Sequence, residues 1–213
     1  SIAVSQMDIR LDDTHLNGQM KIQRLPKIQT EFNLVVDQIN FDKYLTTEEK
    51  TSLSPEAAAV GATTLPNDLL RSLNGNGKIK IEKLKISGVT IKNLILNGQA
   101  NDGQIEINPI RATLYEGKYA GVVSLDATKE DTTINMKTQL EGIEIGPLLH
   151  DKTGSDYLKG SGSVKFQLNA SGKSMEQLIR SAQGDSVITL SKGVFTGVDA
   201  PALLATVERI IEC

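Results

Sequence analysis

The sequence predicts a mainly β fold: a long, curved, open antiparallel sheet or partial barrel, with a few short helices at its ends or on its apolar face. Apolar and polar residues alternate along most of the chain, as at Val164, Phe166 and Leu168, and this period of two is typical of a strand with one buried face. Glycine-containing turn signals separate the alternating segments. Long apolar runs, which mark parallel sheets covered on both faces, do not occur, so we expect antiparallel pairing.

Composition and charge argue against some classes of function for this chain and indicate the make-up of its core. Of the 213 residues, 39% are hydrophobic and 4% aromatic, with no Trp, so the core must consist mainly of Ile, Leu and Val. The 23 Lys and Arg residues are balanced by 26 Asp and Glu, which leaves no positive excess to hold a polyphosphate backbone, so nucleic-acid binding is not expected. A lone cysteine, Cys213, excludes an intrachain disulfide. No apolar run reaches the roughly 18 residues of a membrane span, and we expect a fragment of a longer protein.

The phase of the alternation defines a candidate surface. Two slips of one residue, between Ile81 and Leu84 and between Ile91 and Leu94, predict a bulge or strand break that keeps the apolar side chains on one face and bends the sheet. Some apolar residues have phases that allow them to share one face, and these are our candidates for lining a groove. They are Ile79, Ile81, Ile105, Ile107, Val123, Leu125, Ile134, Met136, Val164, Phe166 and Leu168.

Turn and cap signals divide the chain. Hairpin turns are predicted at Asn74-Gly75-Asn76-Gly77, Ser87-Gly88, Asn97-Gly98, Asn101-Asp102-Gly103, Glu116-Gly117 and Gly160-Ser161-Gly162. Helices are predicted near 65–73, 175–183 and 200–211. The second begins with Ser174 and Gln177 in a capping-box pattern, and Gly184 is placed to end it.

We expect three segments: a β-unit over 1–45, a linker or mobile insertion over 46–64, and a β-rich C-terminal domain over 65–213. A weak internal repeat supports this division. Leu11 to Gly18 has the same offset as Leu114 to Gly121, and the segment 39–45 parallels the segment 143–149.

Motifs for catalysis or metal binding do not assemble. His15 and His150 each lack a second His or a Cys at metal-site spacing, so we predict no metal and no cofactor. Asp12-Asp13 is interpreted as a turn, and Gly172-Lys173-Ser174 lacks the upstream glycine of a phosphate-binding loop. The apolar face itself remains, and two interpretations stay open: an ordinary core sealed by the helices, or a groove left partly open for acyl chains.

The segment from Leu158 to Asp199 resembles the C-terminal signature of the AsmA family of bacterial cell-envelope proteins. Paired glycines enter a strand, a capped amphipathic helix follows, and a glycine-rich exit ends on an aspartate. Two positions depart from the pattern: Ala182 stands where a larger aliphatic residue is usual, and Ser186 where a second glycine is common. The residues that carry the resemblance are structural: Gly160, Gly162, Gly172, Ser174, Gly184, Gly193, Gly197 and Asp199.

The resemblance implies a protein without enzymatic activity that acts in outer-membrane biogenesis and lipid homeostasis. It implies a periplasmic β-rich part, anchored to the inner membrane by an N-terminal helix outside this sequence, and similar to the repeating-β-groove lipid-transfer proteins. The expected partner is a phospholipid or another envelope lipid, with other envelope proteins as further partners. An alternative is an assembly factor that binds outer-membrane protein precursors by strand addition.

Overall fold

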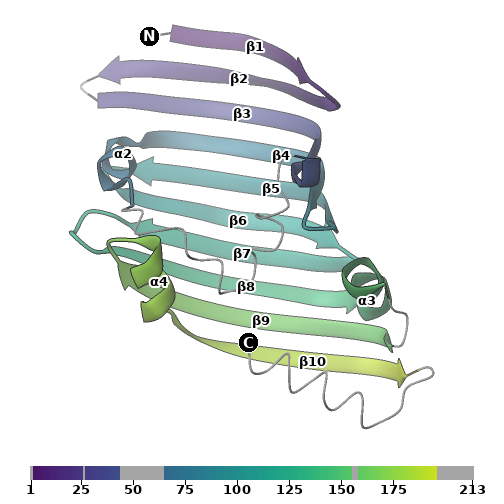
Figure 1. The fold of residues 1–213 in the computed structure, drawn as a ribbon. Helices are drawn as coiled ribbons and strands as arrows, with labels where there is room; N and C mark the ends of the chain where they lie inside the picture. Colours follow the sequence, from purple (N-terminus) through teal and green to yellow (C-terminus); the bar gives the residue numbers. More distant parts are fainter. Residues whose placement is uncertain (1, 26, 44–64, 155–157, 196–213) are drawn as a thin grey trace.

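A single ten-stranded sheet dominates the computed structural model, which describes residues 2–25, 27–43, 65–154 and 158–195. The strands lie in chain order from β1 to β10, and the sheet is open rather than closed into a barrel (Figure 1). This confirms the mainly β prediction. The strands are β1 (Ile2–Leu11), β2 (Thr14–Leu25), β3 (Lys27–Asn40), β4 (Asn74–Ile86), β5 (Val89–Asn101), β6 (Gln104–Leu114), β7 (Gly117–Asp126), β8 (Thr132–Glu144), β9 (Leu158–Gly172) and β10 (Gln183–Phe195).

One strand pair departs from the expected antiparallel order. β3 and β4 are parallel, with Leu34 opposite Ile79 and Val36 opposite Ile81, whereas all other neighbours are antiparallel. A parallel pair needs a long crossover connection, and residues 41–73 between these strands supply it. Alternation alone cannot reveal strand direction, so the sequence argument missed this pair.

The predicted slips in phase are confirmed. Between β4 and β5 the pairing passes from Ile81 opposite Leu94 to Lys83 opposite Lys92 and leaves out Glu82 and Asn93. Asn93 has a positive φ of 52°, a conformation that Asn adopts more readily than most residues. Because Glu82 is left out of the pairing, the next inward-facing residue after Ile81 is Leu84, three positions later. Ile81 and Leu84 therefore lie in one buried cluster with Val36 of β3.

Glycine signals predicted turns at only half of their positions. Ser87-Gly88, Asp102-Gly103 and Glu116-Gly117 lie in or beside hairpin turns, with positive φ at Ser87, Asp102 and Glu116. The predictions at 74–77, 97–98 and 160–162 are wrong, because these residues lie inside β4, β5 and β9. There the glycines leave room for neighbouring side chains: a Cβ on Gly77 would meet the Phe32 ring at 2.2 Å, and one on Gly162 would meet Ile145 at 2.8 Å.

Short helices lie at the ends of the strands (Figure 1). Two predicted helices are confirmed as α2 (Asn67–Ser72) and α4 (Met175–Ser181); the third, near 200–211, and the insertion over 46–64 lie outside the described residues. Gly184 does not end α4 but pairs with Leu168 inside β10. The structure adds η1 (Phe41–Lys43) and α3 (Ile145–Thr153), which the sequence argument treated as exits from strands.

The two segments of the internal repeat have corresponding structures. β1 to β3 end in η1, and β6 to β8 end in α3. Near the end of β3 and of β8, the spacing between consecutive inward-facing residues rises from two to three. These pairs are Val36 and Ile39 in β3, and Leu140 and Ile143 in β8. Both segments belong to one continuous sheet, since β3 pairs with β4. The division into an upstream unit and a C-terminal unit stays a prediction.

Candidate functional site on the apolar face

Strand register places every groove candidate on one face of the sheet. Residues directly opposite each other on neighbouring strands project to the same side of the sheet. Followed from β4 to β9, these pairs keep the candidates on one side throughout. The matched rows are Ile79, Leu96 and Ile110; Ile107, Val123, Met136 and Leu168; Ile105, Leu125, Ile134 and Ala170; and Leu140 with Val164, while Thr138 faces Phe166. We call this surface the apolar face.

Burial varies along this face. Toward α3 and η1, Val36, Ile81 and Leu84 are 4%, 8% and 8% exposed and form a closed cluster. The candidate Ile81 therefore lies in a core. Toward α2 and α4, Ala127 and Leu178 are buried. Between the two ends the side chains are half-buried, namely Ile105, Ile107, Val123, Leu125, Ile134, Met136 and Leu168.

Helices α2 and α4 close one end of the face. The Arg71 guanidinium of α2 donates to the Ala127 and Lys129 carbonyl oxygens, each at 2.6 Å. In α4, the Ser174 hydroxyl caps the helix by accepting from the Gln177 backbone N–H at 3.2 Å, which confirms the predicted cap. The Gln177 side chain accepts from the Lys173 N–H at 2.8 Å, one residue before the position expected in a capping box.

Helix α3 closes the opposite end. Tyr115, in the turn after β6, donates its hydroxyl to the Asp151 carboxylate at 2.6 Å, and Lys152 donates to the Ser87 carbonyl at 2.6 Å. Burial, followed by the hydrogen bond to Asp151, raises the pKa of Tyr115 far above its ordinary value. The phenol therefore stays protonated and acts as a donor that holds α3 to the sheet.

Two facing glycines interrupt the aliphatic rows of the apolar face beside Phe32. The ring of Phe32 lies over Gly77, and Gly77 is directly opposite Gly98 in β5. The nearest atom to a Cβ added to Gly98 would be the Glu106 carbonyl oxygen at 3.9 Å, an ordinary van der Waals contact, so a Cβ fits there. Ile107 stands on the far side of Gly98. At this pair the face presents backbone without side chains, between Phe32 and Ile107.

The family-like glycines have packing roles. An added Cβ on Gly172 would meet Gln177 of α4 at 2.6 Å, and one on Gly184 would meet the Gln167 carbonyl at 2.1 Å. Gly160 has a φ of +140°, and a Cβ added to it would meet the Gly193 Cα at 3.0 Å. Gly197 and Asp199 lie outside the described residues.

The remaining polar motifs stay separate from the apolar face. His15 contacts Asp8 at 3.0 Å, and no group of three His, Cys, Asp or Glu side chains that could hold a metal occurs among the described residues. Lys173 pairs with the Glu130 carboxylate. None of the helices in the described part of the chain is long and apolar enough to cross a membrane.

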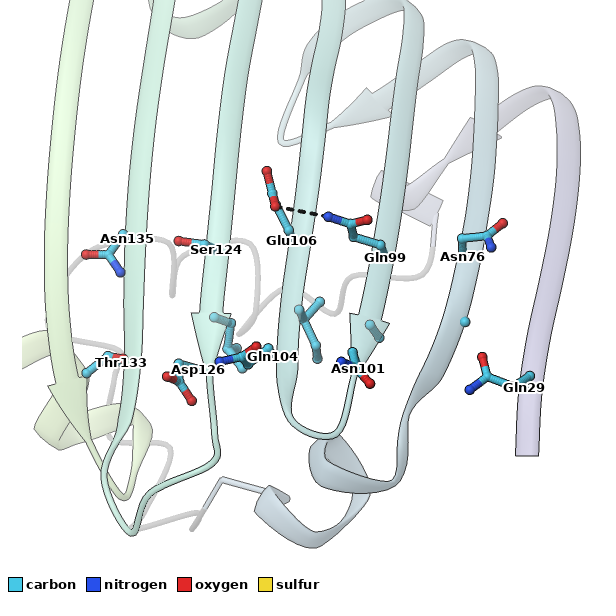
Figure 2. A pocket seen from close by; sticks show the side chains of 14 residues that line it. Gln29, Asn76, Gln99, Asn101, Gln104, Glu106, Ser124, Asp126, Thr133 and Asn135 are labelled. Atoms are coloured by element: carbon cyan, nitrogen blue, oxygen red, sulfur yellow. Dashed lines mark hydrogen bonds between the residues drawn. The ribbon is translucent and has the colours of Figure 1, made fainter. Parts of the chain in front are cut away.

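Sequence reasoning missed a hollow whose polar lining comes from the opposite face of the sheet. The hollow has a volume of about 690 Å³ and is lined mainly by polar residues of β3 to β8 (Figure 2). Gly75, Ala100 and the groove candidates Ile105 and Leu125 complete its lining. Runs of Asn and Gln at the polar positions of these strands were the available signal.

Comparison with known proteins identifies a family. The matching family model is described as AsmA family and covers residues 4–209, nearly the whole chain. No curated protein and no solved structure matches.

Proposed function

The chain belongs to the AsmA family of bacterial envelope proteins, and from this premise we propose that its apolar face binds the acyl chains of phospholipids or other envelope lipids. Membership brings with it a role in the cell envelope and in outer-membrane biogenesis, and family members are generally not enzymes. We also propose that the lipid lies along a groove, that the chain is periplasmic, and that the full protein is anchored in the inner membrane.

The continuous, half-buried apolar face supports this proposal best. In-register aliphatic rows extend from β3 to β9, and the described helices close only the strand ends. Exposed contiguous apolar patches on a protein surface commonly mark interaction sites. Gly98 has no side chain, so part of an acyl chain can lie on its backbone between Phe32 and Ile107.

The mechanism that fits this surface is passive. An acyl chain leaves water by lying on the aliphatic rows, and each buried CH₂ contributes about 0.8 kcal/mol. The rows from β6 to β9 that hold Ile107 and Ile105 are aliphatic, so the head group stays in water beyond them. Longer chains are then held more tightly, and movement from row to row breaks no directional bond.

Paired measurements of lipid retention and stability test the proposal. Ile107→Asn and Ile134→Asn each place an amide on the apolar face, and Val122→Asn makes the same kind of change on the opposite face of β7. The two apolar-face variants are expected to retain less fluorescent phospholipid while the Tm falls modestly, and Val122→Asn is expected to retain it fully. A wild-type chain that retains no lipid, together with apolar-face variants that all unfold, would show a sealed core.

A second function, strand addition to a protein precursor, is favoured by β10. This strand ends the sheet, and Val187, Ile188 and Leu190 are more than 60% exposed. An edge strand offers unpaired N–H and C=O groups to an extended peptide. Peptide binding that is lost when proline replaces the residue whose N–H points outward, with lipid retention unchanged, would support this function.

A further inference from the structure

We propose that the polar hollow on the opposite face binds a neutral saccharide. This inference goes beyond lipid binding, because it concerns the polar side chains of the hollow, which project away from the apolar face at alternate positions of the same strands. The hollow of about 690 Å³ falls within the size range of small-molecule sites. Its polar lining consists of Gln29, Asn76, Gln99, Asn101, Gln104, Glu106, Ser124, Asp126, Thr133 and Asn135.

Register arranges these side chains as a lattice. One row runs Asn76, Gln99, Glu106, Ser124 and Asn135 across five strands, each directly opposite the next. A second row runs Asn101, Gln104, Asp126 and Thr133. Neighbouring strands are about 4.8 Å apart, so hydrogen-bonding groups recur at short, regular intervals. Figure 2 shows these side chains projecting from the same face.

Carboxamides suit a ligand rich in hydroxyl groups. An amide side chain offers both donors and an acceptor, and a hydroxyl group also donates and accepts. No hydrogen bond joins the side chains of Gln104 or Asn135 to another residue within the described ranges, and both side chains are exposed in the hollow. They are therefore available to a ligand.

Charge excludes the main competing ligands. None of the residues that line the hollow is Lys, Arg or His, so a phosphate or carboxylate would meet no cation there. The two carboxylates are already engaged: Glu106 accepts from Gln99 at 3.1 Å and from Asn108 at 2.9 Å. Asp126 accepts from the backbone and hydroxyl of Thr128 at 2.9 and 2.6 Å. A cation would therefore compete with donors from the chain itself.

The other half of the same face has a different composition. There Lys83 and Lys92 are directly opposite each other, and Lys118 follows across β6. Charged side chains of this kind are the ordinary solution for a solvated surface. Amides also lie elsewhere on this face, as at Gln167, but the hollow brings two adjacent rows of uncharged and acidic polar side chains together without a lysine between them.

Titration with maltotriose and chitotriose, followed by the side-chain NH₂ signals of Asn and Gln in ¹H–¹⁵N spectra, tests the inference. The amide signals of the hollow are expected to shift. Gln104→Ala/Asn135→Ala is expected to weaken binding about tenfold, because each net hydrogen bond contributes about 0.5–1.5 kcal/mol. The control Gln167→Ala, which removes an exposed amide on the same face outside the hollow, is expected to leave binding unchanged.

Three results would overturn the inference: no shift with either trisaccharide, equal weakening by the control, or a response to spermidine or inorganic phosphate in place of the saccharides. The Tm of each variant is measured alongside. Should the double variant not fold, Asn76→Ala replaces it, since Asn76 is also exposed and belongs to the same row.

Discussion

The two faces of one sheet carry opposite chemistry over the same strands. In β6, Ile105 and Ile107 project to the apolar face, and Gln104 and Glu106 project to the polar hollow. In β8, Ile134 and Asn135 divide in the same way. The backbone hydrogen bonds of the ladder serve both surfaces at once, so the sheet needs no second layer to satisfy its polar backbone groups.

The faces differ in how their side chains are held. On the apolar face, aliphatic side chains pack beside one another in rows, and no directional bond defines their positions. On the polar face, hydrogen bonds such as Gln99 to Glu106 orient individual side chains. A surface of the first kind adapts to chains of varying length, whereas one of the second kind selects by the placement of donors and acceptors. Substitutions in the buried cluster, in the half-buried middle of the apolar face and at hydrogen-bonded positions test this comparison.

The largest effect is expected where the apolar face is a true core. Leu84→Ala removes an 8% exposed side chain from the cluster with Val36 and Ile81 and should cost about 2–5 kcal/mol of unfolding free energy. Leu125→Ala removes the same side chain from the half-buried part and should cost clearly less. Urea unfolding measures both, and equal losses would mean that the middle of the face is as closed as its end.

A smaller difference in stability is expected between valine substitutions at the two facing glycines. Gly77→Val places a Cβ 2.2 Å from the Phe32 ring, and such overpacking costs about 1–3 kcal/mol. Gly98→Val brings its Cβ only to an ordinary van der Waals contact, and its φ lies outside the left-handed region, so stability should stay level or rise by a few tenths of a kcal/mol.

The same two variants test whether the glycine pair forms part of the lipid site. Gly98→Val fills the space between Phe32 and Ile107 and should weaken phospholipid retention without a fall in Tm. Retention that matches the wild type in a stable Gly98→Val chain would place the acyl chain elsewhere on the face.

The cap of α4 gives an effect of about 1 kcal/mol at the closed end. Ser174→Ala removes the acceptor for the Gln177 N–H, whereas Ser174→Gly should cost only a few tenths of a kcal/mol. Chemical denaturation of both variants measures the difference. Equal losses would mean that the hydroxyl does not stabilise the helix through this bond.

Much of the fold could be predicted because period two records which side of a strand faces the apolar surface. Helix α3 was missed although its signals are present: Pro147 lies in the first turn and Gly154, with a φ of 70°, follows the last. The glycines at 74–77 were misassigned because glycine serves both turns and close approaches. Only the position of Phe32, on another strand, distinguishes the two uses.

The candidate surface was predictable in orientation but not in depth. Phase placed Ile81 and Ile107 on one face correctly, yet one is buried in a cluster and the other is half-buried. That difference depends on which elements meet at the strand ends, and these contacts join residues far apart in the chain. The polar hollow was missed for a similar reason, since its amides come from five strands and meet only through register.

The smallest effect concerns a charge at the edge of the polar face. The hydrogen bond from Lys27, at 2.6 Å, and then the one from Asn74, at 3.2 Å, hold the pKa of Asp102 below its ordinary value. A depressed pKa means that the folded state favours the carboxylate. The resulting stabilisation is present above about pH 4 and is lost as the pH falls through the lowered pKa. Asp102→Asn should therefore lower the urea midpoint at neutral pH, and its difference from the wild type should shrink in acid. Lys27→Met, which removes the first cause, should reduce the same pH-dependent difference. A difference that stays constant from neutral pH into acid would show that Asp102 contributes through its shape and not through its charge.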